Sequence, residues 1–104
     1  MKLLTFTDRL IEGIRPKRSI LNVGLDPQLR YMPPHLCKEA VEAYGRTRRA
    51  IGWLFAEFNR RIIDAISPFA VSVKPQIAFY ECYGAAGMEA FETTLAYARA
   101  RGLV

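Results

Sequence analysis

The sequence predicts an α/β fold with a parallel sheet. Helix-like and strand-like patterns alternate along 104 residues, in the order helix, strand, helix, strand, helix and the beginning of a third strand. This alternation generates parallel strands joined by right-handed crossovers. Two strand-like segments are almost continuously apolar, and each delivers one charged residue directly before a proline, at Asp26-Pro27 and Lys74-Pro75. We therefore expect adjacent parallel strands that present a carboxylate and an ammonium at one rim of the sheet.

The first helix and the first strand are predicted from the residues before Asp26. Apolar residues recur at helical spacing behind Thr7, the expected N-cap, and this helix should end within 13–16. Residues 19–25 then form a nearly continuous apolar run, which indicates a strand buried on both faces. Prolines at positions 27, 33 and 34 predict a loop over 26–36, and this loop includes His35, which we expect on the surface.

The longest predicted element is one helix over about 37–66. Its apolar stripe comprises Ile51, Leu54, Phe55, Phe58, Ile62, Ala65 and Ile66, at three- and four-residue steps. Gly45 and Gly52 could bend this helix, but neither is a strong helix breaker. Ser67-Pro68 should end it, and a second strand should begin near Ala70.

A third helix is predicted over about 86–101. Its expected core face consists of Met88, Phe91, Leu95 and Ala98. Gly102 is well placed just beyond its end, and Leu103-Val104 would enter a third strand. Parallel strands buried on both faces need more sheet and more helices around them, so we expect 1–104 to be a single incomplete domain.

Composition excludes several classes of function. A content of 51% hydrophobic and 24% charged residues is typical of a soluble globular protein, and no apolar stretch is long enough to cross a membrane. The formal net charge of +5 comes from clusters at segment ends and on one helix, without a nucleic-acid-binding motif beside them. We expect neither a nucleic acid nor a membrane as partner, while an anionic small molecule suits the charge.

Cysteine usage indicates a reducing compartment. Cys37 and Cys82 are too few and too irregularly spaced for a disulfide framework, and the N-terminus lacks the apolar region of a secretory signal. The expected location is the cytoplasm. No metal-ligand cluster, P-loop, dinucleotide fingerprint or catalytic triad is present in the sequence, so the residues predict no metal site.

Asp26 and Lys74 are the residues expected to carry chemistry. A carboxylate at a strand end can accept hydrogen bonds from sugar hydroxyls or pair with a cation, although Asp26 could equally cap the turn before Pro27. Lys74 should emerge from the adjacent strand, about 5 Å away in backbone spacing, where an ion pair with Asp26 is plausible. A structural salt bridge is the alternative for Lys74. Asn22 is expected to be a hydrogen-bonding core residue.

Several motifs resemble the N-terminal part of orotidine 5′-phosphate decarboxylase, in its longer bacterial branch. The motifs are Phe6-x-Asp8-Arg9-Leu10, Val23-Gly24-Leu25-Asp26-Pro27, and above all Val73-Lys74-Pro75-Gln76-Ile77-Ala78-Phe79-Tyr80-Glu81 with Tyr83-Gly84 and Gly87. The Lys-Pro-Gln-x-Ala-Phe-Tyr-Glu run is specific, whereas Gly-Leu-Asp-Pro alone would be weak. The resemblance runs along essentially the whole chain.

The resemblance implies a fold, an activity and residue roles. Members of that family are dimeric (β/α)₈ TIM barrels that convert orotidine monophosphate to uridine monophosphate and carbon dioxide without a cofactor, in pyrimidine synthesis. By resemblance, these 104 residues would be the leading helix, about two βα units and the start of strand three. Asp26 would hold a ribose hydroxyl of the substrate, and Lys74, as a substrate-binding and catalytic residue, would be the first lysine of an alternating Lys-Asp-Lys-Asp network.

One part of the family pattern is missing from these residues. The lysine that donates the proton lies in an Asp-Ala-Lys-Arg-x-Asp motif on strand three of the family fold, and that motif is not found here. We therefore expect the 104 residues to be inactive by themselves. Two alternatives stay open: a non-catalytic chain that associates with itself through exposed strand edges, and another sugar-phosphate enzyme on the same barrel.

Overall fold

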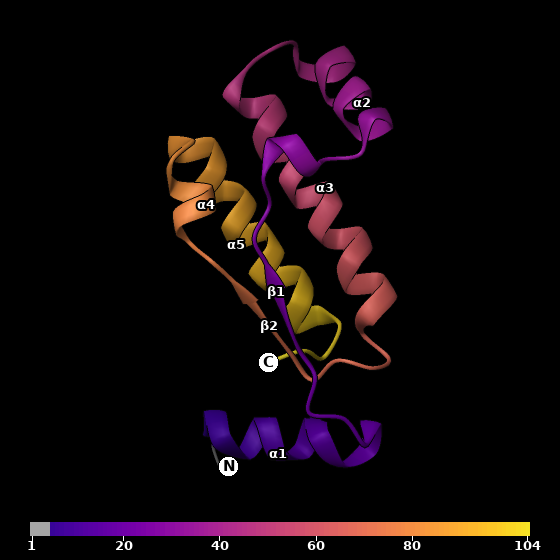
Figure 1. Cartoon of the computed structure of the whole chain (residues 1–104). Helices are drawn as coiled ribbons and strands as arrows, with labels where there is room; N and C mark the ends of the chain where they lie inside the picture. The colour runs from indigo at the N-terminus through magenta and orange to yellow at the C-terminus, as the bar shows by residue number, and fades with distance from the viewer. Residues whose placement is uncertain (1–4) are drawn as a thin grey trace.

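The computed structural model describes residues 5–104, which form an elongated α/β unit measuring 46 × 24 × 21 Å. Two long helices lie behind a short sheet, and the first helix crosses one end of it (Figure 1). The elements are α1 (Phe6–Lys17), β1 (Asn22–Leu25), the 3₁₀ turn η1 (Leu29–Tyr31), α2 (Pro34–Tyr44), α3 (Arg48–Ile66), β2 (Ser72–Pro75), α4 (Ala78–Glu81) and α5 (Gly84–Ala100).

The sheet is parallel, as the sequence predicts. β1 pairs with β2 in a register that places Gly24 opposite Lys74 and Leu25 opposite Pro75. On the other edge of β2, Val104 donates its N–H to the Val71 carbonyl over 3.0 Å and accepts from the Val73 N–H over 3.2 Å. In a parallel ladder, one residue bonds through its N–H and its carbonyl to two residues of the neighbouring strand, as Val104 does to Val71 and Val73. Val104 thus pairs with the second edge of β2 at one residue, but the sheet of the described residues has two strands, β1 and β2, and the third strand stays a prediction.

Helices α3 and α5 cover one face of this sheet. Leu25 of β1 lies in one cluster of buried side chains with Ile63 of α3 and Ala98 of α5, and Val23 and Val73 pack against the same cluster. A larger cluster near the other end of α3 includes Met32, Leu36, Ala40, Ala50, Leu54, Phe55, Tyr80 and Ala90. Burial of these side chains is the main force that fixes the helices on the sheet.

Glycines let the helical layer pack closely. A Cβ on Gly87 of α5 would lie 1.8 Å from the Tyr80 carbonyl oxygen of α4, and a Cβ on Gly52 of α3 would lie 2.6 Å from the Ala86 carbonyl oxygen of α5. Both distances are far inside van der Waals contact, so only glycine permits these backbone approaches. α4 and α5 thereby hold Tyr80 with no exposed surface.

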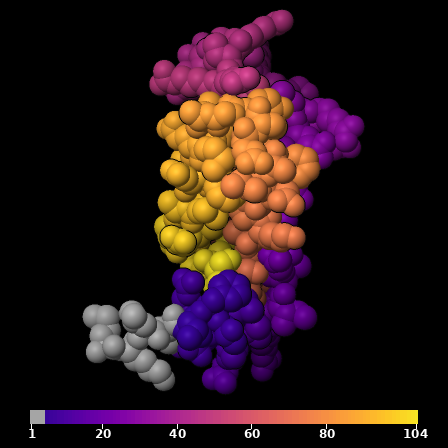
Figure 2. Space-filling model, turned by 90° about the vertical axis from the view of Figure 1, so that its left-hand side faces the viewer, coloured from indigo at the N-terminus to yellow at the C-terminus, as the bar shows by residue number. Residues whose placement is uncertain are grey.

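Helix α1 lies at the end of the sheet where the strands begin. Figure 2 shows α1 in indigo below the column formed by α4, α5 and β2, with the magenta segment that joins α2 to α3 at the opposite end. The Lys17 ammonium donates to the Ala70 carbonyl over 2.6 Å, and Gly13 lies against the Val71 side chain. No residue of α1 is buried.

The start of α1 differs from the prediction. Thr5, not Thr7, is the N-cap, because Thr5 and Asp8 form a capping box in which each side chain accepts from the other's backbone N–H. A capping box at Thr7 would need a hydrogen-bond acceptor three residues later, and Leu10 at that position has none. The helix also continues past its predicted end to Lys17, where Arg18 closes it in the left-handed conformation at φ 51°.

The predicted long helix over 37–66 is wrong, since two helices occupy this region. Gly45 has φ +72° and ends α2, and the Thr47 hydroxyl begins α3 by accepting from the Ala50 N–H over 3.2 Å. Because α2 begins at Pro34, the predicted loop over 26–36 is too long and His35 is helical. His35 is exposed, as expected.

The burial of the strands and of α5 also departs from the prediction. Ile20 and Leu21 are 83% and 47% exposed, and regular pairing begins only at Asn22, so the strand over 19–25 is not buried on both faces. Helices cover only one side of this sheet. In α5 the buried residues are Gly87, Ala90, Thr94 and Ala98, while the predicted Met88, Phe91 and Leu95 are half-buried.

Candidate functional site

Asp26 and Lys74 lie at the carboxyl ends of β1 and β2, on one side of the sheet. Side chains alternate between faces along a strand, so Gly24 and Asp26 share a face of β1, and the register gives Lys74 the same face of β2. The alternate residues of β1, Val23 and Leu25, point to the helices. The predicted placement of both charges at one rim is confirmed, and both residues are exposed there.

The expected ion pair between these two residues does not form. Among residues 5–104 no contact within 4.0 Å joins the Asp26 carboxylate to the Lys74 ammonium. The register explains this, because Lys74 stands opposite Gly24, two positions before Asp26, or about 6.6 Å along the strand. The Asp26 carboxylate instead turns back over Gly24, where a Cβ would lie 3.5 Å from Oδ2. Both charged groups therefore stay available to a third partner.

Polar residues extend along the same open face of the sheet. Asn22 and Ser72 are paired across β1 and β2 one repeat before Gly24 and Lys74, and both line a hollow together with Lys74. Asn22 is exposed, so the expectation of a hydrogen-bonding core residue is wrong. The sheet thus has an apolar face toward the helices and a polar face away from them.

Behind the end of β1 lies a buried polar cluster that the sequence did not reveal. The Tyr80 hydroxyl of α4 donates to the Leu25 carbonyl over 2.8 Å. It also accepts from Nδ2 of Asn59 over 2.9 Å, and the same Nδ2 donates to the Thr94 hydroxyl over 3.1 Å. All three side chains are buried, with exposed fractions of 0% for Tyr80 and Asn59 and 2% for Thr94. The cluster ties α3, α4 and α5 to the last residue of β1.

The environment of Tyr80 keeps its hydroxyl protonated. Burial raises the pKa of Tyr80 to about 12, the hydrogen bond from Asn59 acts in the opposite direction, and the nearby negative charge of Asp26 adds to the increase. Its ring packs edge-on against Phe55 and Phe91, with centroid distances of 6.2 and 5.2 Å. A protonated, fixed phenol is a reliable donor to the Leu25 carbonyl.

Only part of this cluster left a signal in the sequence. Asn59 stands on the apolar stripe of α3, four residues after Phe55 and four before Ile63. A polar residue on a core-facing stripe predicts a buried partner, because an unpaired amide in the core is costly. The identity of that partner depends on the tertiary structure, since Tyr80 and Thr94 are 21 and 35 residues away. Gln76 and Glu81, which follow Lys74 in the motif that carries the resemblance, are both exposed.

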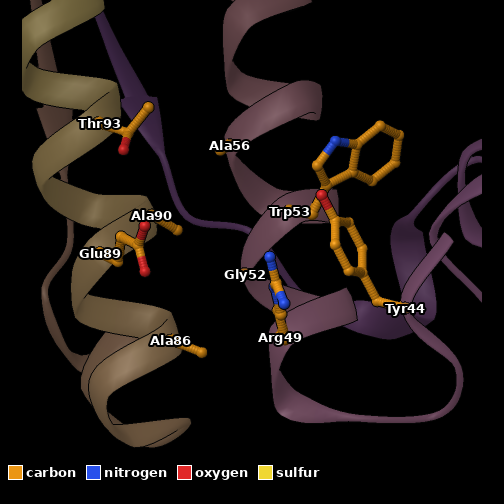
Figure 3. A pocket seen from close by; sticks show the side chains of 9 residues that line it. All are labelled: Tyr44, Arg49, Gly52, Trp53, Ala56, Ala86, Glu89, Ala90 and Thr93. Carbon is orange, nitrogen blue, oxygen red and sulfur yellow. The ribbon is translucent and has the colours of Figure 1, made fainter.

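A second concavity lies between α3 and α5, away from the strand ends. Figure 3 shows its small residues Gly52, Ala56, Ala86 and Ala90 between the two helices, with Trp53 and Tyr44 on the α3 side and Glu89 on the α5 side. Arg49 lies over the Tyr44 ring, 4.7 Å from its centroid. Neither Asp26 nor Lys74 lines this groove. Trp53 is half-buried and packs against the larger core cluster beside the groove.

The described residues offer neither a metal-binding cluster nor a membrane-spanning helix. Within 5–104 no group of three or more His, Cys, Asp or Glu side chains is arranged to hold a metal ion. Nor does this part of the chain include a helix that is both long and apolar enough to cross a membrane. Cys37 and Cys82 are free thiols.

Fold and site define a class of protein. A parallel sheet covered by helices, with a carboxylate and an ammonium at the carboxyl ends of neighbouring strands, is the arrangement of α/β proteins that bind ligands at that rim.

Sequence comparison identifies the relatives within this class as orotidine 5′-phosphate decarboxylases. The chain is 41% identical over 91 residues to the one from Parabacteroides distasonis, which is 88% of this chain and 28% of the relative. It is 36% identical over 102 residues to that from Caldicellulosiruptor saccharolyticus, or 98% of this chain and 33% of the relative. No family model matches. These relatives confirm the resemblance read from the motifs, and the chain spans about a third of their length.

Proposed function

We propose that this sequence provides part of the substrate site of an orotidine 5′-phosphate decarboxylase, which forms uridine monophosphate and carbon dioxide. The observation that carries the proposal is the shared rim of Asp26 and Lys74, in a chain whose curated relatives bear that name. A third partner can reach both groups, because they are exposed and not paired with each other. A ribose hydroxyl and an orotate carboxylate would suit the carboxylate and the ammonium respectively.

In this proposal Asp26 binds the sugar of the nucleotide. Its carboxylate accepts hydrogen bonds from a ribose hydroxyl, and charged acceptors form stronger hydrogen bonds than neutral ones. Lys74 is the first lysine of a charge network beside the reacting carbon. Fixed charges of this kind stabilise a carbanion as carbon dioxide leaves, with no need for a cofactor. The proton donor of the family motif is not among these 104 residues.

The rest of the enzyme is proposed from the same resemblance. Residues 1–104 would be one incomplete domain: the leading helix, two βα units and the start of strand three of a (β/α)₈ barrel. The open polar face of the sheet would then line the barrel interior, and the helices its outer layer. We propose a homodimer located in the cytoplasm. The two free thiols support a reducing compartment.

The experiment is a graft into a working relative. Residues 1–104 replace the corresponding segment of the Parabacteroides distasonis enzyme, and the fall in orotidine monophosphate absorbance is recorded. We expect the graft to turn over substrate. Asp26→Ala should raise KM about tenfold or more, through the loss of a charged hydrogen bond, and Lys74→Ala should reduce kcat by about a hundredfold or more. Residues 1–104 alone should show no turnover.

Lys38→Ala is the matched control for these substitutions. Lys38 stands on α2 with its side chain 79% exposed, in an ion pair of 4.0 Å with Glu42, and should leave KM and kcat unchanged. The function is rejected if the folded graft is inactive, or if Asp26→Ala and Lys74→Ala behave like Lys38→Ala. Turnover of another sugar phosphate by the graft would favour a different enzyme on the same barrel.

A further inference from the structure

We propose that Tyr80 is the positioning residue of Asp26, because its hydroxyl fixes the peptide unit from which Asp26 projects. The effect of Tyr80 on substrate binding rests on the proposed function of Asp26. Its effect on the Asp26 backbone rests on the hydrogen bond to Leu25.

The hydrogen bond from Tyr80 acts on the peptide bond between Leu25 and Asp26. Tyr80 donates to the carbonyl oxygen of Leu25 over 2.8 Å. That oxygen, the Leu25 carbon, the Asp26 nitrogen and the Asp26 Cα lie in one plane, because the peptide bond does not rotate. A hydrogen bond that holds the oxygen therefore also orients the Asp26 Cα. The phenol acts on Asp26 without touching its carboxylate.

The backbone of Asp26 is restricted on its C-terminal side as well. Pro27 is buried, and a proline limits the preceding residue to extended conformations. Asp26 thus lies between a hydrogen-bonded peptide unit and a proline, although its own side chain is exposed. An exposed carboxylate on so constrained a backbone has few positions to sample, and preorganisation of this kind favours binding.

The Tyr80 phenol also connects the ends of the two strands. Tyr80 follows Lys74 by six residues, across the turn in which the Tyr80 N–H donates to the Ile77 carbonyl. The hydrogen bond from Tyr80 to Leu25 therefore joins the segment after β2 to the end of β1. This bond adds a buried side-chain link to the β1–β2 ladder, which already pairs Gly24 with Lys74 and Leu25 with Pro75.

The Tyr80 phenol is itself held in place by α3 and α5. Asn59 and Thr94 complete the buried cluster, and Nδ2 of Asn59 uses both its hydrogens on the two hydroxyls. The Asn59 Oδ1 atom is buried without a hydrogen-bond partner. A buried acceptor without a partner carries a penalty. The retention of this amide in the core, despite the penalty, is accounted for by its two bonds to Tyr80 and Thr94.

The test compares Tyr80→Phe with Tyr97→Phe in the 104-residue chain. Both variants lose one tyrosine hydroxyl, but the Tyr97 hydroxyl donates to Asp64 at the opposite end of the helical layer. The readout is the NMR order parameter of the Asp26 N–H, which is about 0.85 in rigid backbone and below about 0.6 in flexible backbone. We expect a fall toward the flexible value in Tyr80→Phe and no change in Tyr97→Phe. Equal values in both variants would overturn the proposal.

The wild-type chain provides a measurement that does not depend on a variant folding. A hydroxyl proton held between Tyr80 and Leu25 should exchange slowly enough with water to give its own resonance, with a nuclear Overhauser effect to Leu25 or Asp26. The absence of that resonance under conditions where other buried hydroxyl protons are seen would also overturn the proposal.

A kinetic arm separates positioning from a purely structural role. In the graft defined above, Tyr80→Phe should raise KM about tenfold with kcat little changed, and should add nothing further in the Asp26→Ala background. Additive effects would mean that Tyr80 does not act through Asp26. If the wild-type graft is inactive, the proposed function fails, while the order parameter still decides whether Tyr80 holds Asp26.

Discussion

Tyr80 is completely buried, and its hydroxyl forms two hydrogen bonds. Its phenol donates to Leu25, accepts from Asn59 and has a pKa raised to about 12 by burial. A raised pKa means that the folded state holds the proton more tightly than the unfolded chain, whose tyrosines titrate near 10. The stability contribution of Tyr80 is thus present at all pH values below about 10.

Alkaline titration should expose this contribution. As pH rises through 10 the unfolded chain loses the Tyr80 proton while the folded state keeps it until about 12, so the free energy of unfolding should fall across that window. Urea unfolding at a series of pH values from 8 to 12 measures the fall. Tyr80→Phe should be less stable at pH 8 but should decline less between pH 10 and 12. Identical declines in Tyr80→Phe and wild type would show that the phenol titrates normally.

At the scale of elements, the close contact between α4 and α5 requires a residue without a side chain, Gly87. Gly87 lets α5 approach the Tyr80 carbonyl to a distance that no other residue allows. Tyr80 contributes its backbone to this contact and its hydroxyl to the Leu25 carbonyl. A shift of α5 would therefore also move the end of β1. Any group placed at position 87 must displace α4.

Gly87→Ala should therefore destabilise the chain strongly. Adding a methyl group to a packed backbone contact costs about 1–3 kcal/mol, and a Cβ 1.8 Å from an oxygen belongs at the upper end. Chemical denaturation measures the loss. Gly24→Ala is the matched control, because its Cβ would meet no atom closer than 3.5 Å, and it should change stability by about 0.5 kcal/mol or less. Equal losses in the two variants would refute the packing argument.

The sequence predicted element types better than element ends. Alternating patterns were sufficient for the parallel sheet and for Asp26 and Lys74 at its rim, because strand ends and prolines are local features. The division of 37–66 into two helices depended on Gly45 adopting φ +72° and on the Thr47 cap, which apolar spacing does not encode. The Tyr80 cluster was missed since its hydrogen bonds join distant segments, and α4, a helix of four residues, was not predicted.

At the scale of the molecule, the sheet is covered on one face only. Large apolar side chains near the beginning of the strands remain in solvent, with Ile20 83% and Phe69 64% exposed. β1 also has an outer edge without a paired strand in the described residues. Exposed edges and apolar groups of this kind favour pairing with another chain.

The 104-residue chain should accordingly associate with itself. Analytical ultracentrifugation should give a species of at least twice the 11.8 kDa chain mass at micromolar concentration. Ile20→Lys should shift the population toward monomer, because it replaces an exposed apolar side chain just before β1 by a charge, which opposes association, whereas Lys38→Ala on α2 should not. A compact monomer in the wild type would contradict the open-edge argument.

Helix α1 packs against the end of the sheet where the strands begin, through very few contacts. None of its residues is buried, and a single ammonium, that of Lys17, bonds it to the Ala70 carbonyl. Free energies of local opening are smallest where little apolar surface is covered. α1 should thus detach and rebind many times during the lifetime of the folded sheet, and acylation of the Lys17 amine would shift that equilibrium toward the detached helix.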